Sequence, residues 1–183
     1  MAPAEIELRK AFFAHRNGVV ADALRAAGDS HSIVMGCQLT DVVAIASNYT
    51  PDAELAQALW NDHGHRECRM AATMLYPVDE FTIETAMEWC LGVESTEIAD
   101  VLCHRLLRKL PFACVLVERL LHENGEPLVR YTAFRLLLNL VLMGKARLGD
   151  AWQSMIEAER ARGEALLLPV LTSLQEEFCP VVR

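Results

Sequence analysis

The sequence predicts an all-α protein, an α-α superhelix of about ten short helices stacked in pairs. Apolar residues recur at helical spacing along the whole chain, and no useful length alternates with the period of two that a strand requires. Gly, Pro, Asn and Asp punctuate these patterns at short intervals. Helices this short favour a right-handed stack of helix pairs over a four-helix bundle, and we expect the second helix of each pair to line its concave side.

The pair around which the chain is organised spans residues 51–76. Thr50 is expected to cap the first helix and Pro51 to occupy its first position. Gly64 then breaks the apolar pattern, and a second amphipathic run begins at His65 and must end near Pro77. Neither helix can bury its apolar stripe alone, so the pair needs neighbours of the same kind.

The other expected helices follow the same reasoning. Ser95 is expected to cap the helix that ends at Pro111, and the helix over 128–143 is apolar enough to be buried on most sides, with one polar line of Thr132, Arg135 and Asn139. The helix capped by Ser95 is expected at 96–110, and the remaining helices are expected at 3–16, 19–27, 37–47, 81–91, 112–122, 148–162 and 164–178.

Composition predicts one domain, residues 1–183, in the cytoplasm. The longest apolar stretch, residues 136–143, is too short to span a bilayer, and charged residues occupy the place of a secretory signal's apolar core. The six cysteines form no C-x-x-C and are expected to be reduced. The nearest metal-ligand candidates are His63, His65 and Cys68, but such a cluster at a helix entrance is more often turn chemistry. We therefore predict no metal and no cofactor.

The charge is distributed unevenly. The whole chain carries −8, yet residues 100–147 hold eight Lys or Arg against four acids, so this segment is +4 and the remainder is −12. The basic segment is either a surface for phosphates or the solvated ridges of ordinary helices.

An internal similarity supports a repeat architecture. Arg69, Ala72 and Leu75 share the spacing R-x-x-A-x-x-L with residues 130, 133 and 136, each time in the second helix of an expected pair. This phrase is typical of HEAT repeats.

The stretch LAQALWNDHGHRECRMAATML resembles the DNA alkylation repair family, the HEAT-like glycosylases of the AlkD type, and the resemblance extends over residues 40–145. Trp89 precedes Asp100 by eleven residues, the family's separation between a structural tryptophan and the catalytic aspartate. PLVRYTAF resembles the repeat whose arginine, here Arg130, approaches the DNA backbone. The resemblance implies a solenoid that holds duplex DNA and excises cationic alkylated bases without a metal or cofactor.

The chain departs from the family where aromatic residues are expected. The phrase N-W-W-x-x-x-D has Glu94, Ser95 and Thr96 at the corresponding letters, and Trp152 has no adjacent basic residue. We therefore expect glycosylase activity to be weak or lost, even though Asp100 is retained.

Each candidate residue has a structural alternative. Asp100 would stabilise an oxocarbenium-like centre, or form a charge ladder with His104 and Arg108 along one helix. Arg69, Arg130 and Arg135 would contact phosphates, or some of them would bridge repeats through carboxylates and helix C-termini. Two functions remain open: binding of alkylated or distorted duplex DNA, and a HEAT scaffold for a protein partner.

Overall fold

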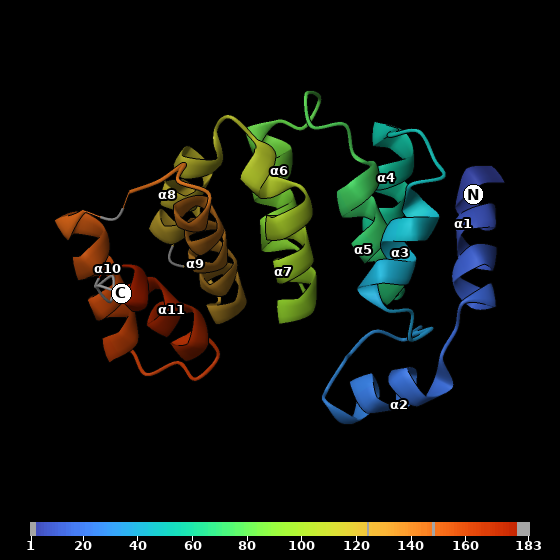
Figure 1. Ribbon diagram of the computed structural model, residues 1–183, viewed down its shortest axis with the longest axis horizontal. Coiled ribbons are helices and arrows are strands. Elements are labelled where there is room, and N and C mark those ends of the chain that lie inside the picture. The colour runs from blue at the N-terminus through green and yellow to red at the C-terminus, as the bar shows by residue number, and fades with distance from the viewer. Residues whose placement is uncertain (1–2, 124, 148, 179–183) are drawn as a thin grey trace, which may run out of the picture. The chain divides into compact units, whose positions relative to one another are not determined.

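The computed structural model describes residues 3–123, 125–147 and 149–178. In this part of the chain the regular secondary structure consists of helices joined by loops (Figure 1). It contains eleven α-helices and one 3-10 helix, and its only β-type pairing is an isolated bridge between Ile33 and His65. The predicted all-α fold class is confirmed. None of the described helices is both long and apolar enough to cross a membrane.

The helices gather into two compact units, Met1–Thr82 and Ile83–Arg183. The single domain predicted over residues 1–183 stays a prediction, and each unit is described by itself.

The first unit is built around the predicted central pair. It contains α1 (Pro3–Ala14), α2 (Gly18–Ala26), α3 (Leu39–Ala46), α4 (Ala53–Trp60) and α5 (Arg66–Leu75). Helix α5 packs against α4, α3 and α1, and nine of its residues are buried. Within this unit α2 lies crosswise near the ends of α1 and α3 (Figure 1).

The second unit is built around its longest helix. It contains α6 (Ile83–Leu91), α7 (Thr96–Arg105), the 3-10 helix η1 (Leu107–Lys109), α8 (Ala113–His122), α9 (Pro127–Leu142), α10 (Asp150–Ala161) and α11 (Leu168–Phe178). Helix α9 packs against α7, α8 and α11 and buries eleven residues, as its apolar sequence predicts. Leu148, where α10 was expected to begin, lies outside the described residues.

Two helix ends differ from the predictions. Helix α4 begins later than expected, because the carboxylate of Asp52 accepts the amide of Leu55 at 2.7 Å and acts as the N-cap in place of Thr50. Pro51 therefore precedes the cap. The α-helix after Ser95 ends at Arg105, and its last turn tightens into η1 before Pro111. Ser95 is the cap there, since its hydroxyl accepts the amide of Ile98 at 3.2 Å.

A buried carboxylate fixes the loop between α2 and α3. Glu67 is fully buried, and its oxygens accept the amides of Met35, Gly36 and Cys37 at 3.0 to 3.3 Å and the guanidinium of Arg66 at 2.9 Å. A carboxylate in the interior is tolerated only when it is hydrogen-bonded in this way. The network therefore attaches the loop rigidly to α5.

The cysteines of the described residues are free, and four of the five are buried. Burial raises the pKa of Cys37 to about 11, and it also raises the pKa of Cys68 and Cys90, so these thiols stay protonated. Cys179 lies outside the described residues.

Candidate nucleic-acid interface

The candidate site lies within the second unit, where α7 packs along α9. Asp100 is on α7, on the side opposite the core residues Ile98, Val101 and Leu102. Its side chain is 38% exposed, so it is supported by the fold and still open to solvent. A carboxylate in this position is accessible to a ligand.

Two side chains of α9 hold this carboxylate. The hydroxyl of Tyr131 donates to Asp100 Oδ1 at 2.8 Å, and Arg135 Nε lies 3.1 Å from the same oxygen. Tyr131 and Arg135 are four residues apart and therefore share one face of α9. Burial raises the pKa of Tyr131, and the hydrogen bond to Asp100 raises it further, so the phenol remains a donor.

The partners of Asp100 differ from those that a charge ladder along one helix would give it. The charge ladder expected along one helix would pair Asp100 with His104, but the partners of Asp100 come from the neighbouring helix. The carboxylate, the phenol and the guanidinium thus form a small polar cluster across α7 and α9, which we call the Asp100 cluster.

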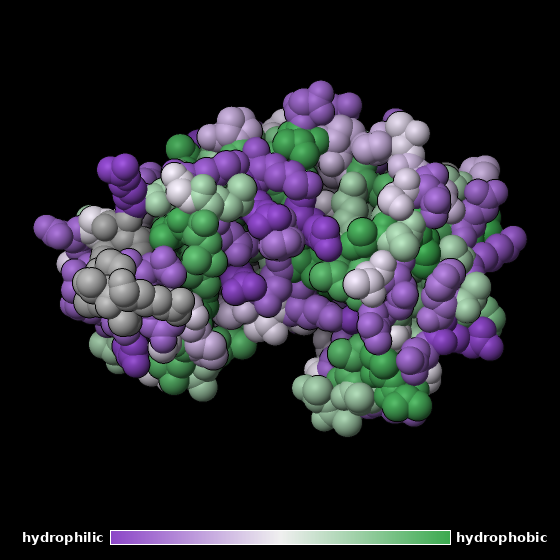
Figure 2. Space-filling view, viewed as in Figure 1, coloured by the Kyte–Doolittle hydropathy of each residue, from purple (hydrophilic) through white to green (hydrophobic). Residues whose placement is uncertain are grey.

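Basic side chains border the Asp100 cluster. The pKa of His104 is lowered by burial and then by four neighbouring cations, namely Arg105, Arg108, Lys109 and Arg135. The pKa of Lys109 is lowered by burial and by two of the same arginines. Burial is the larger cause of each shift, and the neighbouring cations act in the same direction, so positive side chains are close together here. Hydrophilic side chains gather over α7 on the face shown in Figure 2.

Lys145 connects the segment after α9 with the basic residues of η1. Its ammonium donates to the carbonyl oxygen of Arg108 at 2.8 Å, which ties the segment after α9 to η1. The basic surface is therefore assembled from α7, η1 and α9 together. Anions are attracted to such a surface, and phosphates are well matched to its guanidinium groups.

Arg130 lies elsewhere and is only 7% exposed. Its Nε donates to Glu159 Oε1 of α10 at 2.9 Å, and its Nη1 donates to the carbonyl oxygen of Gly125 before α9. The guanidinium therefore links α9 to α10. Such a bridge between neighbouring helices is the structural role that the sequence analysis set beside a phosphate contact.

Arg69 is in the first unit and is fully buried. Its Nη1 donates to the carbonyl oxygen of Trp60 at 2.8 Å, and its guanidinium lies 3.8 Å from the centroid of the Trp60 ring. Arg69 and Arg130, which occupy the same position in the R-x-x-A-x-x-L repeat, therefore make equivalent contacts. Each donates to a carbonyl oxygen at or beyond the end of the preceding helix.

Sequence patterns alone do not identify Tyr131 as a site residue. Its position four residues before Arg135, on the same face of one helix, is the signal that the sequence offers. Among the predicted site residues, the structure brings together Asp100 and Arg135. Arg130 binds Glu159 and Gly125 instead, and Arg69 belongs to the first unit.

These features define a class of protein, an all-helical protein of packed helix pairs with an open carboxylate beside a basic surface. The family model described as "DNA alkylation repair enzyme" matches residues 8–134, more than half of the chain. The protein belongs to this family, as the sequence resemblance indicated. The match includes Asp100 and Tyr131 and ends one residue before Arg135. No curated protein and no solved structure matches the chain.

Proposed function

We propose that the protein binds alkylated or distorted duplex DNA through the surface formed by α7, η1 and α9, with glycosylase activity weak or lost. The observation that carries this proposal is the Asp100 cluster, because its open carboxylate lies beside a basic surface in a chain of the DNA alkylation repair family.

The proposal assigns different roles to the charged residues. Asp100 faces the base or sugar and stabilises positive charge there, since a carboxylate interacts favourably with a cationic alkylated base. Arg135 orients Asp100 and, with Arg105, Arg108 and Lys109, pairs with backbone phosphates. Arg69 and Arg130 have a structural role, because their guanidinium groups are buried and hydrogen-bonded within the protein.

The test is a titration of a fluorescently labelled duplex at several salt concentrations. We expect the double variant Arg108→Ala/Arg135→Ala to weaken binding and to flatten the salt dependence, because each lost phosphate contact removes about 0.9 from the slope of log K against log salt. The slope should therefore fall by about 1 to 2.

Arg119→Ala is the matched control, since it removes an exposed arginine of α8 from the same basic segment. It should leave the salt slope within about 0.5 of the parent value. The control removes one positive charge and the double variant removes two. A control that loses about half as much slope as the double variant would therefore show that the binding follows net charge rather than this surface. No DNA binding at low salt would favour the protein scaffold instead.

A further inference from the structure

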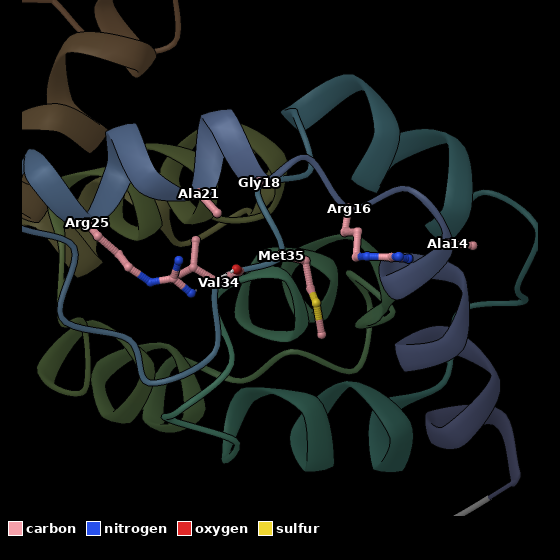
Figure 3. A pocket seen from close by; sticks show the side chains of 7 residues that line it. All are labelled: Ala14, Arg16, Gly18, Ala21, Arg25, Val34 and Met35. Carbon is pink, nitrogen blue, oxygen red and sulfur yellow. Dashed lines mark hydrogen bonds between the residues drawn. The ribbon is translucent and has the colours of Figure 1, made fainter.

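A pocket, which we call the hollow, lies in the first unit, between the end of α1, the start of α2 and the loop before α3 (Figure 3). It has a volume of about 490 Å³, which is within the range of pockets for small ligands. Arg16 and Arg25 are the charged residues that line it, and Ala21, Val34 and Met35 supply an apolar surface between them.

The floor of this hollow is held firmly. The amide of Asn17 donates to the carbonyl oxygen of Met35 at 2.8 Å, and Glu67 holds the amides of the same loop. Gly36 has φ of 75°, and a Cβ there would lie 2.2 Å from the carbonyl oxygen of Asn17. The loop and the start of α2 are thus packed too closely for any other residue, and the hollow is preformed.

The protein uses only part of the hydrogen-bonding capacity of the two arginines. Arg25 is 49% exposed, and its guanidinium makes long contacts of 3.3 Å to Asp22 and 3.4 Å to the carbonyl oxygen of Val34. Asp22 is itself 82% exposed, so water screens that pair. Arg16 donates to the carbonyl oxygen of Phe13 at 2.9 Å, and its guanidinium lies 4.1 Å from the centroid of the Phe13 ring, so its remaining N–H donors are the ones open to a ligand.

The arginines lie on opposite sides of Met35 in Figure 3, with Gly18 between them at the start of α2. The N-terminus of a helix favours negative charge, which adds to the field of the two guanidinium groups. A side chain at Gly18 would meet no atom within 4 Å, so this end of α2 opens onto free space.

We propose that this hollow binds a phosphate-bearing ligand, with Arg16 and Arg25 pairing with its oxyanions and the apolar floor contacting the group between them. Guanidinium groups bind phosphate through paired N–H donors, and the described residues that line the hollow include no carboxylate. Asp22, which contacts Arg25, is 82% exposed and competes only through a screened pair. The phosphate belongs either to a small molecule of nucleotide size or to a nucleic-acid backbone. The site is separate from the Asp100 cluster and does not depend on the function proposed for it.

Calorimetric titration with pyrophosphate tests the small-molecule source, and titration with a labelled DNA duplex tests the backbone source. The double variant Arg16→Ala/Arg25→Ala should weaken binding of at least one probe by about tenfold or more. The control Lys10→Ala removes one positive charge from an exposed position of α1 outside the hollow, and it should change affinity by less than about twofold.

Gly18→Asp provides a test that does not depend on losing arginines. An acidic residue in the first turn stabilises α2, so this variant should unfold no more easily than the parent while it repels the phosphate. Loss with pyrophosphate alone identifies a small ligand, and loss with the duplex identifies the backbone. The proposal is overturned if neither probe binds, or if the probes bind the Gly18→Asp and double-arginine variants as tightly as the parent.

Discussion

The pKa of His65 illustrates how burial can outweigh the effect of neighbouring carboxylates. It is 1% exposed, and burial lowers its pKa from the ordinary 6.5, although Glu67 and Asp62 act in the opposite direction. The unfolded chain therefore binds a proton at a higher pH than the folded chain does. This histidine contributes stability above about pH 6.5 that is lost as the pH falls through its folded-state pKa.

We predict that the free energy of unfolding declines from about pH 7.5 to about pH 5.5, and that His65→Gln makes this decline shallower. Urea unfolding at the two pH values measures it. His122→Gln, at an exposed position on α8, serves as the control and should keep the parent decline. An undiminished decline in His65→Gln would place the titrating group elsewhere.

The Tyr131 hydroxyl holds the carboxylate of Asp100 in the candidate site. Because it donates to a charged acceptor, Tyr131→Phe should lower the free energy of unfolding by about 1 to 3 kcal/mol. A double-mutant cycle with Asp100→Asn, measured by urea unfolding, isolates the pair. Additive effects of the two substitutions would show that the hydrogen bond contributes nothing to stability.

At the scale of elements, the sequence predicted much of the fold because short helices carry their own start and stop signals. Ser95 marked the start of α7, and Gly64 marked the turn between α4 and α5. The start of α4 was misplaced because three adjacent residues all suit a helix start, and only the hydrogen bond to Leu55 decides between them. The tertiary fold supplies that information.

The candidate site was predicted less completely for a related reason. Helical periodicity places a residue on a face of its own helix but does not say which helix covers that face. Asp100 therefore seemed paired with His104, whereas the packing of α7 on α9 gives it Tyr131 and Arg135. Likewise the arginines of the repeat phrase could not be assigned between phosphate and carbonyl until their burial was known.

The buried ion pair between Arg130 of α9 and Glu159 of α10 gives a further prediction. Arg130→Met should cost about 3 to 5 kcal/mol, because it leaves the buried carboxylate of Glu159 without its closest partner. The double variant Arg130→Met/Glu159→Leu should recover much of this loss, since it removes both charges. Urea unfolding measures both variants. Similar destabilisation in the single and double variants would contradict this account, and Arg119→Ala is the matched control.

At the scale of the whole molecule, charge limits where a polyanion can bind. The segment 100–147 carries +4 and the remainder carries −12, so most of the chain repels phosphate at low salt. A binding surface must then be local. The cations around His104 and the two arginines of the hollow are such local concentrations, and they lie in separate units.

The proposal of weak or lost glycosylase activity rests on aromatic residues that the sequence lacks. A carboxylate stabilises positive charge, but excision also requires the cationic base to be held against it, and aromatic faces attract cations by about 0.5 to 2 kcal/mol each. Thr96 stands at the start of α7 where the family pattern has an aromatic residue. Losing two or three such contacts removes about 1 to 6 kcal/mol, which slows the reaction by about tenfold to ten-thousandfold.

We therefore predict that the protein binds methylated duplex DNA but releases 3-methyladenine and 7-methylguanine slowly or not at all. Chromatographic measurement of released bases, with the parent protein compared with Asp100→Asn, tests this. The substitution preserves shape and removes the charge, so any slow release that depends on Asp100 should disappear with it while DNA binding remains. Rapid release by the parent that Asp100→Asn abolishes would show that the carboxylate, held by Tyr131 and Arg135, suffices without aromatic faces.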